Sequence, residues 1–322
     1  MYKIKVGIVG AAGYTGGELI RLLLLHPGVE IIFLHSRTHA NTKVSGVHQD
    51  LLGETDILFT NQYTQKCDVV FLCQGHGASA KTIADFPPAV KIIDLSQDFR
   101  IHAHPSRDFI YGLSELNRDK IIAASNIANP GCFATAIQLA LLPLAHHQLL
   151  QDGIHISATT GSTGAGQSLS ETSHFSYRQN NLSVYKAFVH QHLEEINQNL
   201  KTVQNGFEKN LVMIPMRGSF ARGIFAAITM TTEETLETLK GMFNTYYATH
   251  PFVWVSDTSI DLKQVVNTNK CILYLEKQNN QLIIISVIDN LLKGASGQAV
   301  QNMNLMFGLE ETTGLKLKAS AF

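Results

Sequence analysis

Three glycines spaced three residues apart lie near the start of the chain, between a short apolar run and a helical pattern. They are Gly10, Gly13 and Gly16, and the run before them, residues 3–9, has the composition of a buried strand. Glycines at such a junction permit a tight turn and let the backbone approach a pyrophosphate at the helix N-terminus. We expect Tyr14 and Thr15, inside the loop, to contact the dinucleotide too. The spacing is GxxGxxG rather than GxGxxG, so an ordinary strand-to-helix turn is the alternative.

The rest of the chain changes character at residue 132. Before it, short apolar runs alternate with helical segments, which predicts parallel strands joined by helices. After it, an apolar helix is followed by strands with short connections, which favours a mixed or antiparallel sheet. We therefore expect an α/β protein with a dinucleotide-binding domain and a second, α+β domain. The expected strands cover residues 3–9, 29–35, 69–73, 92–95, 121–124, 154–160, 211–216, 224–231, 271–276 and 282–288, and the expected helices cover 133–144, 191–200, 233–247 and 290–307.

Charge and hydropathy exclude several classes of partner. The formal net charge is −1, and 16% of the residues are charged, so nothing draws the chain generally toward nucleic acid or anionic membrane. No stretch approaches the roughly 20 apolar residues of a membrane span. Glycines interrupt the place where the apolar core of a signal peptide would run. We expect a cytoplasmic enzyme that acts on a small molecule, with no nucleic acid and no membrane as partner.

The end of the second expected strand bears on the choice of dinucleotide. An NAD site usually places Asp or Glu there for the ribose 2′-hydroxyl. This chain has Ser36, Arg37 and Thr38 after His35, with no acid. A hydroxyl and a guanidinium suit a 2′-phosphate, so NADP is the predicted cofactor, with Ser36 and Arg37 as its ligands. The alternative is that Arg37 is a solvated loop residue.

One of the four cysteines lies where a reactive thiol is expected. Pro130 and Gly131 turn the chain, and the apolar helix begins at or just after Cys132. A thiol at a helix N-terminus meets the positive end of the helix dipole and unpaired N–H groups, which favour the nucleophilic thiolate. We predict Cys132 as the nucleophile, and a small buried side chain is the alternative. The buried role is our prediction for the cysteines in or beside apolar strands, Cys67, Cys73 and Cys271.

Longer motifs resemble those of the N-acetyl-γ-glutamyl-phosphate reductase family, which is related to the aspartate-semialdehyde dehydrogenases. They extend along nearly the whole chain: GAAGYTGGEL, DLSQDFR at 94–100, YGLSELN at 111–117, NPGCFAT at 129–135, GSTGAG at 161–166, HQHLEEI at 190–196 and DNLLKGASGQAVQNMN at 289–304. One departure is GCFAT where the family usually has GCYPT. Phe133 lacks a hydroxyl and Ala134 replaces a proline, which puts the rigidity of this loop and the substrate preference in doubt but not the reaction.

The resemblance implies an activity and a domain arrangement. The activity is NADPH-dependent conversion of N-acetyl-γ-glutamyl phosphate to N-acetyl-glutamate semialdehyde through a thioester on Cys132, in arginine biosynthesis. The arrangement is a Rossmann-like NADP-binding domain over residues 1–131, with a C-terminal helix at 292–322 that returns to it. A catalytic and oligomerisation domain with an open mixed sheet would cover residues 132–291. A homo-oligomer, either a dimer or a tetramer, is implied as well.

Residue roles are implied by the same resemblance. His190, the first histidine of the HxH segment, would be the general acid/base, a role that suits an imidazole with its pKa near 6.5. Gly297 and Gln298 would lie by the nicotinamide. The resemblance and the motifs place five residues near the substrate, with no choice made between the two arginines: Asn129, His192, Glu195, Arg217 and Arg222.

Three further points concern metal binding, the acyl group of the substrate and the class of function. We expect no metal, because His190 and His192 would point to different sides of a helix and no third ligand has sensible spacing. An N-succinyl substrate would add a carboxylate that needs a cation, for which Arg178 and Lys186 are candidates. Two rival functions stay open: an aspartate-semialdehyde dehydrogenase and a non-catalytic NADP-sensing protein.

Overall fold

The chain folds as two compact units. A computed structural model describes residues 2–151, 153–208 and 211–320. The first unit ends at Pro130 and also contains Ala295–Lys316, while the second comprises Gly131–Gly294 and the chain end from Leu317. The expected boundary put all of residues 292–322 with the first unit. The end of the chain instead joins the second unit, where the side-chain amide of Asn267 donates to the carbonyl of Lys318 at 3.4 Å.

The described residues of the first unit form a six-stranded sheet in the order β2-β1-β3-β4-β6-β5, and its neighbouring strands run parallel. From β1 the chain moves to one side for β2 and to the other side for β3. This reversal creates a topological switch point at the carboxyl ends of β1 and β3, where open α/β sheets bind ligands. The strands are β1 (Ile4–Val9), β2 (Val29–His35), β3 (Val69–Leu72), β4 (Lys91–Asp94), β5 (Ile110–Tyr111) and β6 (Asn126–Ala128).

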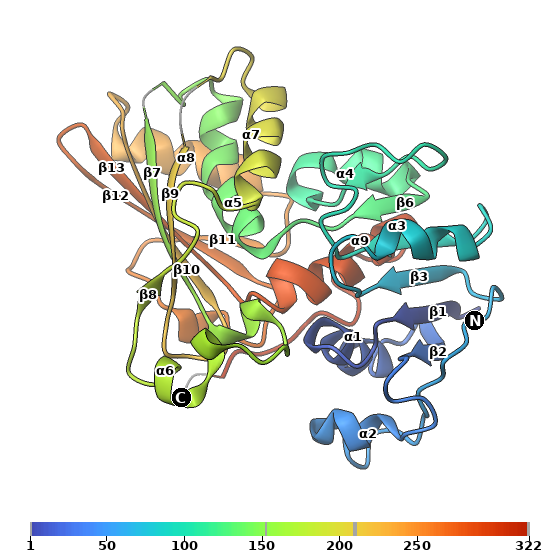
Figure 1. The fold of residues 1–322 in the computed structure, drawn as a ribbon. Coiled ribbons are helices and arrows are strands. Elements are labelled where there is room, and N and C mark those ends of the chain that lie inside the picture. Colours follow the sequence, from blue (N-terminus) through green and yellow to red (C-terminus); the bar gives the residue numbers. More distant parts are fainter. Residues whose placement is uncertain (1, 152, 209–210, 321–322) are drawn as a thin grey trace. The chain divides into compact units, whose positions relative to one another are not determined.

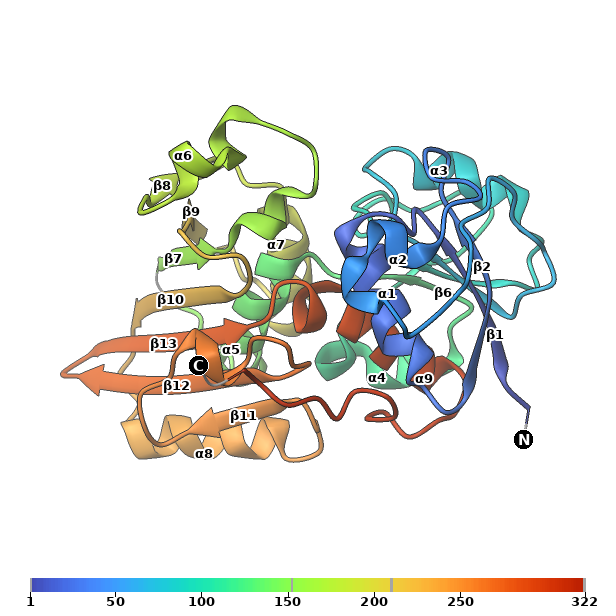
Figure 2. The ribbon, with the colours of Figure 1, turned by 90° about the horizontal axis from the view of Figure 1, so that it is seen from below.

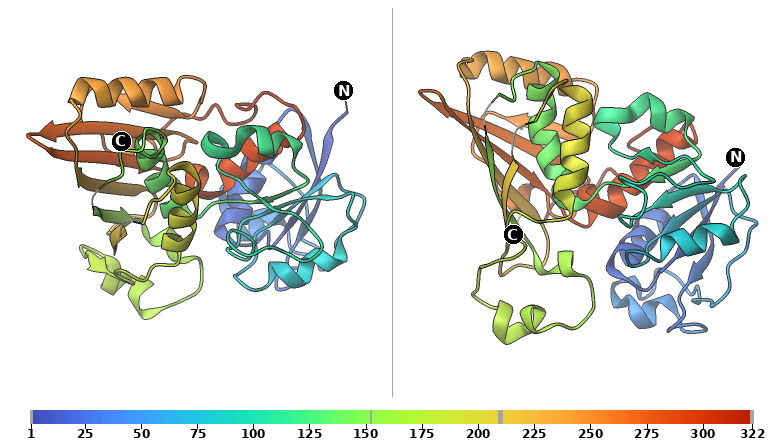
Figure 3. Two further views of the ribbon diagram at one scale, coloured as in Figure 1. Left: turned by 90° about the horizontal axis from the view of Figure 1, so that it is seen from above. Right: turned by 45° about the horizontal axis from the view of Figure 1, so that its top comes forward.

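Helices cover this sheet, and the last helix of the chain joins them. In Figure 3, α9 lies against both α1 and α4 within the first unit. Every residue of α9 is buried, which explains why its sequence carries few charges. The helices are α1 (Tyr14–Leu24), α2 (Val44–Val47), α3 (Ser79–Thr82), α4 (Ser114–Ala123) and α9 (Gly297–Met306).

The prediction of a strand at 121–124 was wrong. Residues up to Ala123 belong to α4, and the strand begins only at Asn126. Ile121 is fully buried as an apolar residue of the helix. A run of three or four apolar residues has the same composition at the end of a buried helix as in a buried strand, so periodicity could not separate the two.

The second unit has a seven-stranded sheet among its described residues, in the order β11-β12-β13-β10-β7-β9-β8. It mixes parallel and antiparallel pairs, as the sequence predicted. The antiparallel pair of β12 and β13 extends as a long hairpin, and α8 lies alongside β11 and β12 (Figure 2). The strands are β7 (Ile154–Thr160), β8 (Ser183–Val184), β9 (Leu211–Arg217), β10 (Ile224–Thr231), β11 (Val253–Ser256), β12 (Cys271–Gln278) and β13 (Gln281–Ile288).

One apolar helix, α5 (Cys132–His146), packs across this sheet against β10 and β13. Its residues from Phe133 to Ala145 are all buried, and α7 (His192–Val203) lies beside it (Figure 1). Because α5 is buried on every side, it is a rigid support for whatever its first residue does. The remaining helices of this unit are α6 (Phe175–Arg178) and α8 (Leu236–Tyr247).

Candidate active site

The glycine loop lies at the switch point of the first unit. Gly10 follows β1 with φ of 82°, a conformation that favours glycine. A Cβ at this position would come 2.6 Å from the carbonyl oxygen of Cys73, which follows β3. Gly10 is therefore required by the close approach of the two loops, whatever binds beside them.

Gly13 has a different reason to be glycine. It is the N-cap of α1 and has ordinary extended backbone angles. A Cβ there would meet only the carbonyl oxygen of Gly10, at 3.7 Å. Neither conformation nor packing demands glycine, so its lack of a side chain serves to keep the N-terminus of α1 open. This open cradle, with the N–H groups that Tyr14, Thr15 and Gly16 contribute at the start of the helix, fits a dinucleotide pyrophosphate.

The start of α9 lies at the same place within the first unit. The hydroxyl of Ser296 donates to the carbonyl of Thr15 at 2.9 Å. Gly297 and Gln298, the next two residues, begin α9 and are buried. Tertiary structure thus brings the C-terminal residues predicted for the cofactor to the glycine loop.

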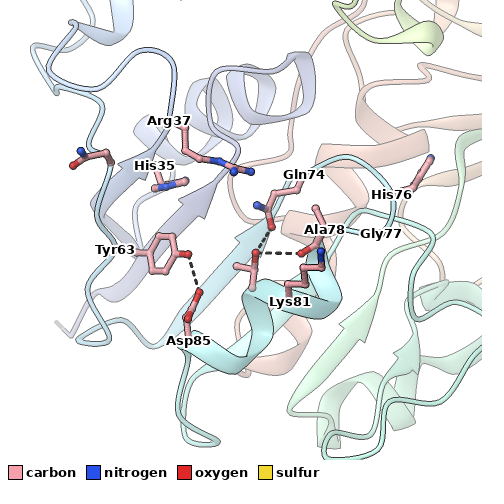
Figure 4. A pocket seen from close by; sticks show the side chains of 11 residues that line it. His35, Arg37, Tyr63, Gln74, His76, Gly77, Ala78, Lys81 and Asp85 are labelled. Atoms are coloured by element: carbon pink, nitrogen blue, oxygen red, sulfur yellow. Dashed lines mark hydrogen bonds between the residues drawn. The ribbon is translucent and has the colours of Figure 1, made fainter.

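A cavity of about 600 Å³ adjoins the end of β2 (Figure 4). Arg37 is exposed and lines this cavity. Ser36 is not among the lining residues: it is buried, and its hydroxyl accepts a hydrogen bond from the amide of His39 at 3.3 Å. Motif reasoning missed most of the wall, because these residues come from several loops: His35, Asn61, Tyr63, Gln74, His76, Gly77, Ala78, Lys81, Thr82 and Asp85.

Cys132 is the first residue of α5, with Gly131 as the N-cap, and its side chain is partly exposed. The missing side chain of Gly294 makes room for it, since a Cβ on Gly294 would lie 2.8 Å from the Cβ of Cys132. Two other thiols are poor nucleophiles, because burial raises the pKa of Cys67 to about 11 and that of Cys73 to about 12.

The N-termini of α5 and α7 meet at this cysteine. The amide of Gly131 donates to Oε2 of Glu195 at 3.1 Å, and Oε1 of the same carboxylate lies 3.9 Å from Nε2 of His192. The imidazole of His192 occupies the space that a side chain on Gly131 would need, within 2.3 Å of the Cβ position. Both His192 and Glu195 are buried. The two predicted substrate residues therefore also hold the turn that presents the thiol.

His190 lies beside His192, with ring centroids 4.6 Å apart, and is 4% exposed. Burial lowers its pKa to about 4, and the charge of Lys186 contributes to the shift. Its Nδ1 accepts a hydrogen bond from the amide of His192 at 3.2 Å. A neutral imidazole that accepts at Nδ1 carries its proton on Nε2. His190 therefore presents an N–H donor at neutral pH rather than the group titrating near 6.5 that the sequence suggested.

Tyr185 joins this cluster and was not predicted. Its ring lies edge-on to that of His190, with centroids 5.8 Å apart, and the guanidinium of Arg217 lies 4.8 Å from its centroid. Burial raises the pKa of the Tyr185 hydroxyl; a thiolate charge on Cys132 raises it further, and Arg217 opposes the shift. The thiol, the tyrosine and the arginine are thus close enough to interact. No local signal could have found Tyr185, since one tyrosine in a loop has no distinguishing pattern.

The two arginines left open by the sequence have different surroundings. Arg222 pairs with the fully buried Asp289, with Nε to Oδ2 at 3.1 Å and Nη2 to Oδ1 at 3.3 Å. That carboxylate also accepts from the amides of Asn267 and Leu291. The charge of Arg222 is therefore matched inside the protein, whereas the guanidinium of Arg217 lies over the Tyr185 ring.

Asn129, also predicted for the substrate, is held within the first unit. Its Nδ2 donates to the carbonyl of Ala295 at 3.1 Å, and its Oδ1 accepts from Asn302 at the same distance. Its own carbonyl accepts from Nε of Arg100 at 2.8 Å. Arg100 ends the DLSQDFR motif, for which the sequence alone suggested no role. The side chain of Asn129 thus ties the strand end to α9 and to the turn before it, a positioning role rather than a free binding group.

The described residues form neither a cluster of metal ligands nor a helix that could span a membrane. Within residues 2–151, 153–208 and 211–320, no three His, Cys, Asp or Glu side chains are grouped as metal ligands. The helices of the same ranges are all too short or too polar to cross a membrane.

A parallel sheet with a glycine loop at its switch point, and a second unit with a mixed sheet and a partly exposed thiol at a helix N-terminus, have the architecture of a nucleotide-dependent enzyme of two units. Family models agree with both units. The NAD binding domain of the semialdehyde dehydrogenases matches residues 5–124, and their dimerisation domain matches residues 132–290.

Curated relatives narrow the assignment. A protein of Bacteroides fragilis named N-acetyl-gamma-glutamyl-phosphate reductase is 56% identical over 322 residues, which cover 99% of this chain and 100% of the relative. The chain belongs to the semialdehyde dehydrogenase family, in the branch of the N-acetyl-gamma-glutamyl-phosphate reductases.

Solved structures show the same fold at much lower identity. Aspartate semialdehyde dehydrogenase II of Vibrio cholerae, complexed with ASA, has a TM-score of 0.72 at 15% identity and covers 96% of this chain and 99% of its own. An aspartate semialdehyde dehydrogenase of Candida albicans, solved with NADP, also has a TM-score of 0.72 at 15% identity, over 94% of this chain and 98% of its own. These likenesses support the fold alone.

Proposed function

We propose that this protein is an NADPH-dependent reductase that converts N-acetyl-γ-glutamyl phosphate to N-acetyl-glutamate semialdehyde through a thioester on Cys132, in arginine biosynthesis. The observation that carries the proposal is the meeting of two helix N-termini at the thiol, where Gly131, His192 and Glu195 form one buried cluster. The names of the curated relatives support the substrate class.

The thiol would act in two stages. The Cys132 thiolate attacks the acyl carbon, so that a carbon–sulfur bond forms while the carbon–oxygen bond to phosphate breaks and phosphate leaves. The hydride that reduces the thioester would come from NADPH, the cofactor proposed for the glycine loop. Breaking the carbon–sulfur bond then releases the aldehyde and restores the thiolate. The N–H groups at the start of α5 are placed to stabilise oxygen charge that develops at the reacting carbon.

We assign the proton and hydrogen-bond chemistry to His190. Its Nε2–H is the group that remains available, because Nδ1 accepts the His192 amide. A neutral donor beside the thiol hydrogen-bonds the charge that develops on sulfur or on the carbonyl oxygen, and exchanges a proton there. His192 and Glu195 position the turn before Cys132, and Arg217 supplies a cation for the phosphate or carboxylate of the substrate.

The acyl group is acetyl in this proposal, with succinyl as second choice. Lys186 is exposed, and its ammonium donates to Oε1 of Gln191 at 3.1 Å. Arg178 is buried and donates to the carbonyl of Arg217 at 2.6 Å and to the hydroxyl of Ser183 at 2.9 Å. Arg178 therefore holds β9 beside the site. A tenfold or greater kcat/KM for the N-succinyl semialdehyde, about 1.4 kcal/mol, would reverse the choice.

We further propose that the protein is a cytoplasmic homo-oligomer assembled through its second unit. The dimerisation-domain description of the matching family model supports this. Light scattering at several concentrations gives the mass in solution, and a monomer at micromolar concentration would contradict the proposal.

The decisive experiment runs the reaction toward the acyl phosphate. N-acetyl-glutamate semialdehyde, phosphate and NADP should produce NADPH, and aspartate semialdehyde should be a much poorer substrate. If aspartate semialdehyde is turned over and N-acetyl-glutamate semialdehyde is not, the protein is an aspartate-semialdehyde dehydrogenase. If neither aldehyde is turned over, an NADP-sensing protein is indicated.

A further inference from the structure

The cavity of the first unit continues directly from the glycine loop. The carbonyl of His35 accepts hydrogen bonds from the amides of Gly10 (3.1 Å) and Ala11 (3.0 Å). On the other side of the loop, a Cβ on Gly10 would come 3.2 Å from the amide nitrogen of Gln74. His35 and Gln74 both line the cavity. The cavity therefore lies where the adenosine half of a dinucleotide extends from a pyrophosphate on the loop.

Two cationic side chains face this cavity from different elements (Figure 4). Arg37 follows β2, and Lys81 lies on α3, which follows β3. Within the described ranges, neither side chain forms an ion pair with a carboxylate. The segments that carry them are far apart in sequence, so only the parallel sheet brings the two charges to one cavity.

Four other polar side chains of the wall are hydrogen-bonded in two pairs. The hydroxyl of Tyr63 donates to the carboxylate of Asp85 at 2.8 Å (Figure 4). The hydroxyl of Thr82 donates to Oε1 of Gln74 at 2.7 Å. Tyr63 also lies edge-on to His35, with centroids 4.8 Å apart. The Asp85 carboxylate is thus hydrogen-bonded to Tyr63 and forms no ion pair with Arg37 or Lys81. The charge that the cavity leaves unmatched is positive.

We propose that Lys81 determines the choice of dinucleotide together with Arg37, by binding the 2′-phosphate of NADPH from a second wall of the cavity. A guanidinium binds phosphate oxygens in a planar fork, and an ammonium adds a compact charge. NADH has a hydroxyl at the same position and gains little from either cation. This inference rests on the proposed function, because it presumes a dinucleotide at the glycine loop.

The test measures binding of free dinucleotides to the full-length protein, without turnover. Dissociation constants for NADPH and NADH are measured by nucleotide fluorescence for the wild type, Lys81→Ala, Arg37→Ala and the double variant. Lys66→Ala is the matched control, since Lys66 is exposed and lies outside the cavity lining. Competition by adenosine 2′,5′-bisphosphate and by 5′-AMP isolates the 2′-phosphate from the rest of the cofactor.

We expect Lys81→Ala to weaken NADPH and the bisphosphate by about tenfold, the scale of a charge-assisted contact, and to change NADH and 5′-AMP by less than about twofold. Equal weakening of both dinucleotides, or no change in either, would overturn the role of Lys81. If Arg37→Ala weakens NADPH binding and Lys81→Ala does not, the inference fails while the proposed function stands. Failure of the wild type to bind either dinucleotide would remove the proposed function itself.

Discussion

The carboxylate of Glu195 accepts a hydrogen bond from the amide of Gly131, the residue immediately before Cys132, at 3.1 Å. The two residues are 64 positions apart in sequence, and the bond joins the first turn of α7 to the start of α5. Because both groups are buried, the bond fixes the direction in which the chain enters the helix and hence the placement of the thiol.

Removing this carboxylate should cost stability. Glu195→Ala leaves a buried amide without its partner, so we expect the free energy of unfolding to fall by about 1–3 kcal/mol. Glu195→Gln keeps an acceptor oxygen and should lose less. Glu194→Ala is the control, because Glu194 is exposed on the same helix turn, and surface changes stay within about 0.5 kcal/mol. Chemical denaturation measures all three, and equal effects of Glu194 and Glu195 would contradict the role.

Alkylation should distinguish Cys132 from the other thiols. Cys132 is partly exposed at the start of α5, Cys67 and Cys271 are buried, and the pKa is raised for Cys67 and for the partly exposed Cys73. Brief treatment with iodoacetamide at neutral pH should therefore modify the peptide carrying Cys132 first, and substrate should protect it. Peptide mass spectrometry measures the order of modification. Equal labelling of the other three cysteines in the native protein would argue against a reactive Cys132.

Replacement of the same cysteine tests the thioester directly. Cys132→Ser should retain the fold and NADPH binding but lose several orders of magnitude in turnover, because a hydroxyl there lacks an adequate base. Wild type mixed with acyl phosphate alone should carry an acyl adduct on this residue. Normal turnover of Cys132→Ser would exclude the mechanism.

His190 should make stability depend on pH. Its pKa lies near 4 when folded and near 6.5 otherwise, so between these values the unfolded chain binds a proton that the folded chain does not. Stability therefore falls as pH drops from about 6.5 toward 4 and is unaffected above that window. His190→Gln should lose part of this slope, unlike the exposed His147→Gln. Urea unfolding across pH 4–8 measures it, and identical slopes in the two variants would show that His190 contributes nothing.

The same histidine should matter for catalysis at neutral pH. His190→Asn should lower kcat by about 10²–10⁴-fold, the usual contribution of proton transfer. His192→Asn should act mainly on substrate affinity and stability, because its ring packs against Gly131. The reverse pattern in steady-state kinetics would exchange the two roles.

Replacement of Arg222 and replacement of Arg217 should have different effects on stability and on KM. Arg222→Ala leaves the buried Asp289 carboxylate unpaired, so we expect a loss of about 3 kcal/mol or more in the free energy of unfolding. Arg217→Ala should change stability less but raise KM for the acyl phosphate. Thermal unfolding and initial rates compare the two variants. An increase in KM confined to an otherwise stable Arg222→Ala would reverse the assignment.

Local sequence determined the features that depend on neighbouring residues. Glycines after an apolar run predict the loop before α1, and Pro130 with Gly131 predicts a helix that starts at Cys132, as observed. The spacing of the expected strands predicted a parallel sheet in the first unit and a mixed sheet in the second. The fold class and the family are confirmed. These signals are local because turns, helix starts and apolar periodicity act over a few residues.

Only the tertiary structure decided which distant residues share a site. Arg217 and Arg222 are equivalent in sequence, and a buried carboxylate 67 residues from Arg222 is what separates them. Tyr185 and Lys81 carry no motif, yet the fold places Tyr185 beside His190 and Lys81 in the wall of the cavity of the first unit. The pKa of His190 fell below its ordinary range because packing removed water from the ring. Burial and long-range pairing arise from contacts between segments that the linear pattern does not relate, so they had to come from the folded chain.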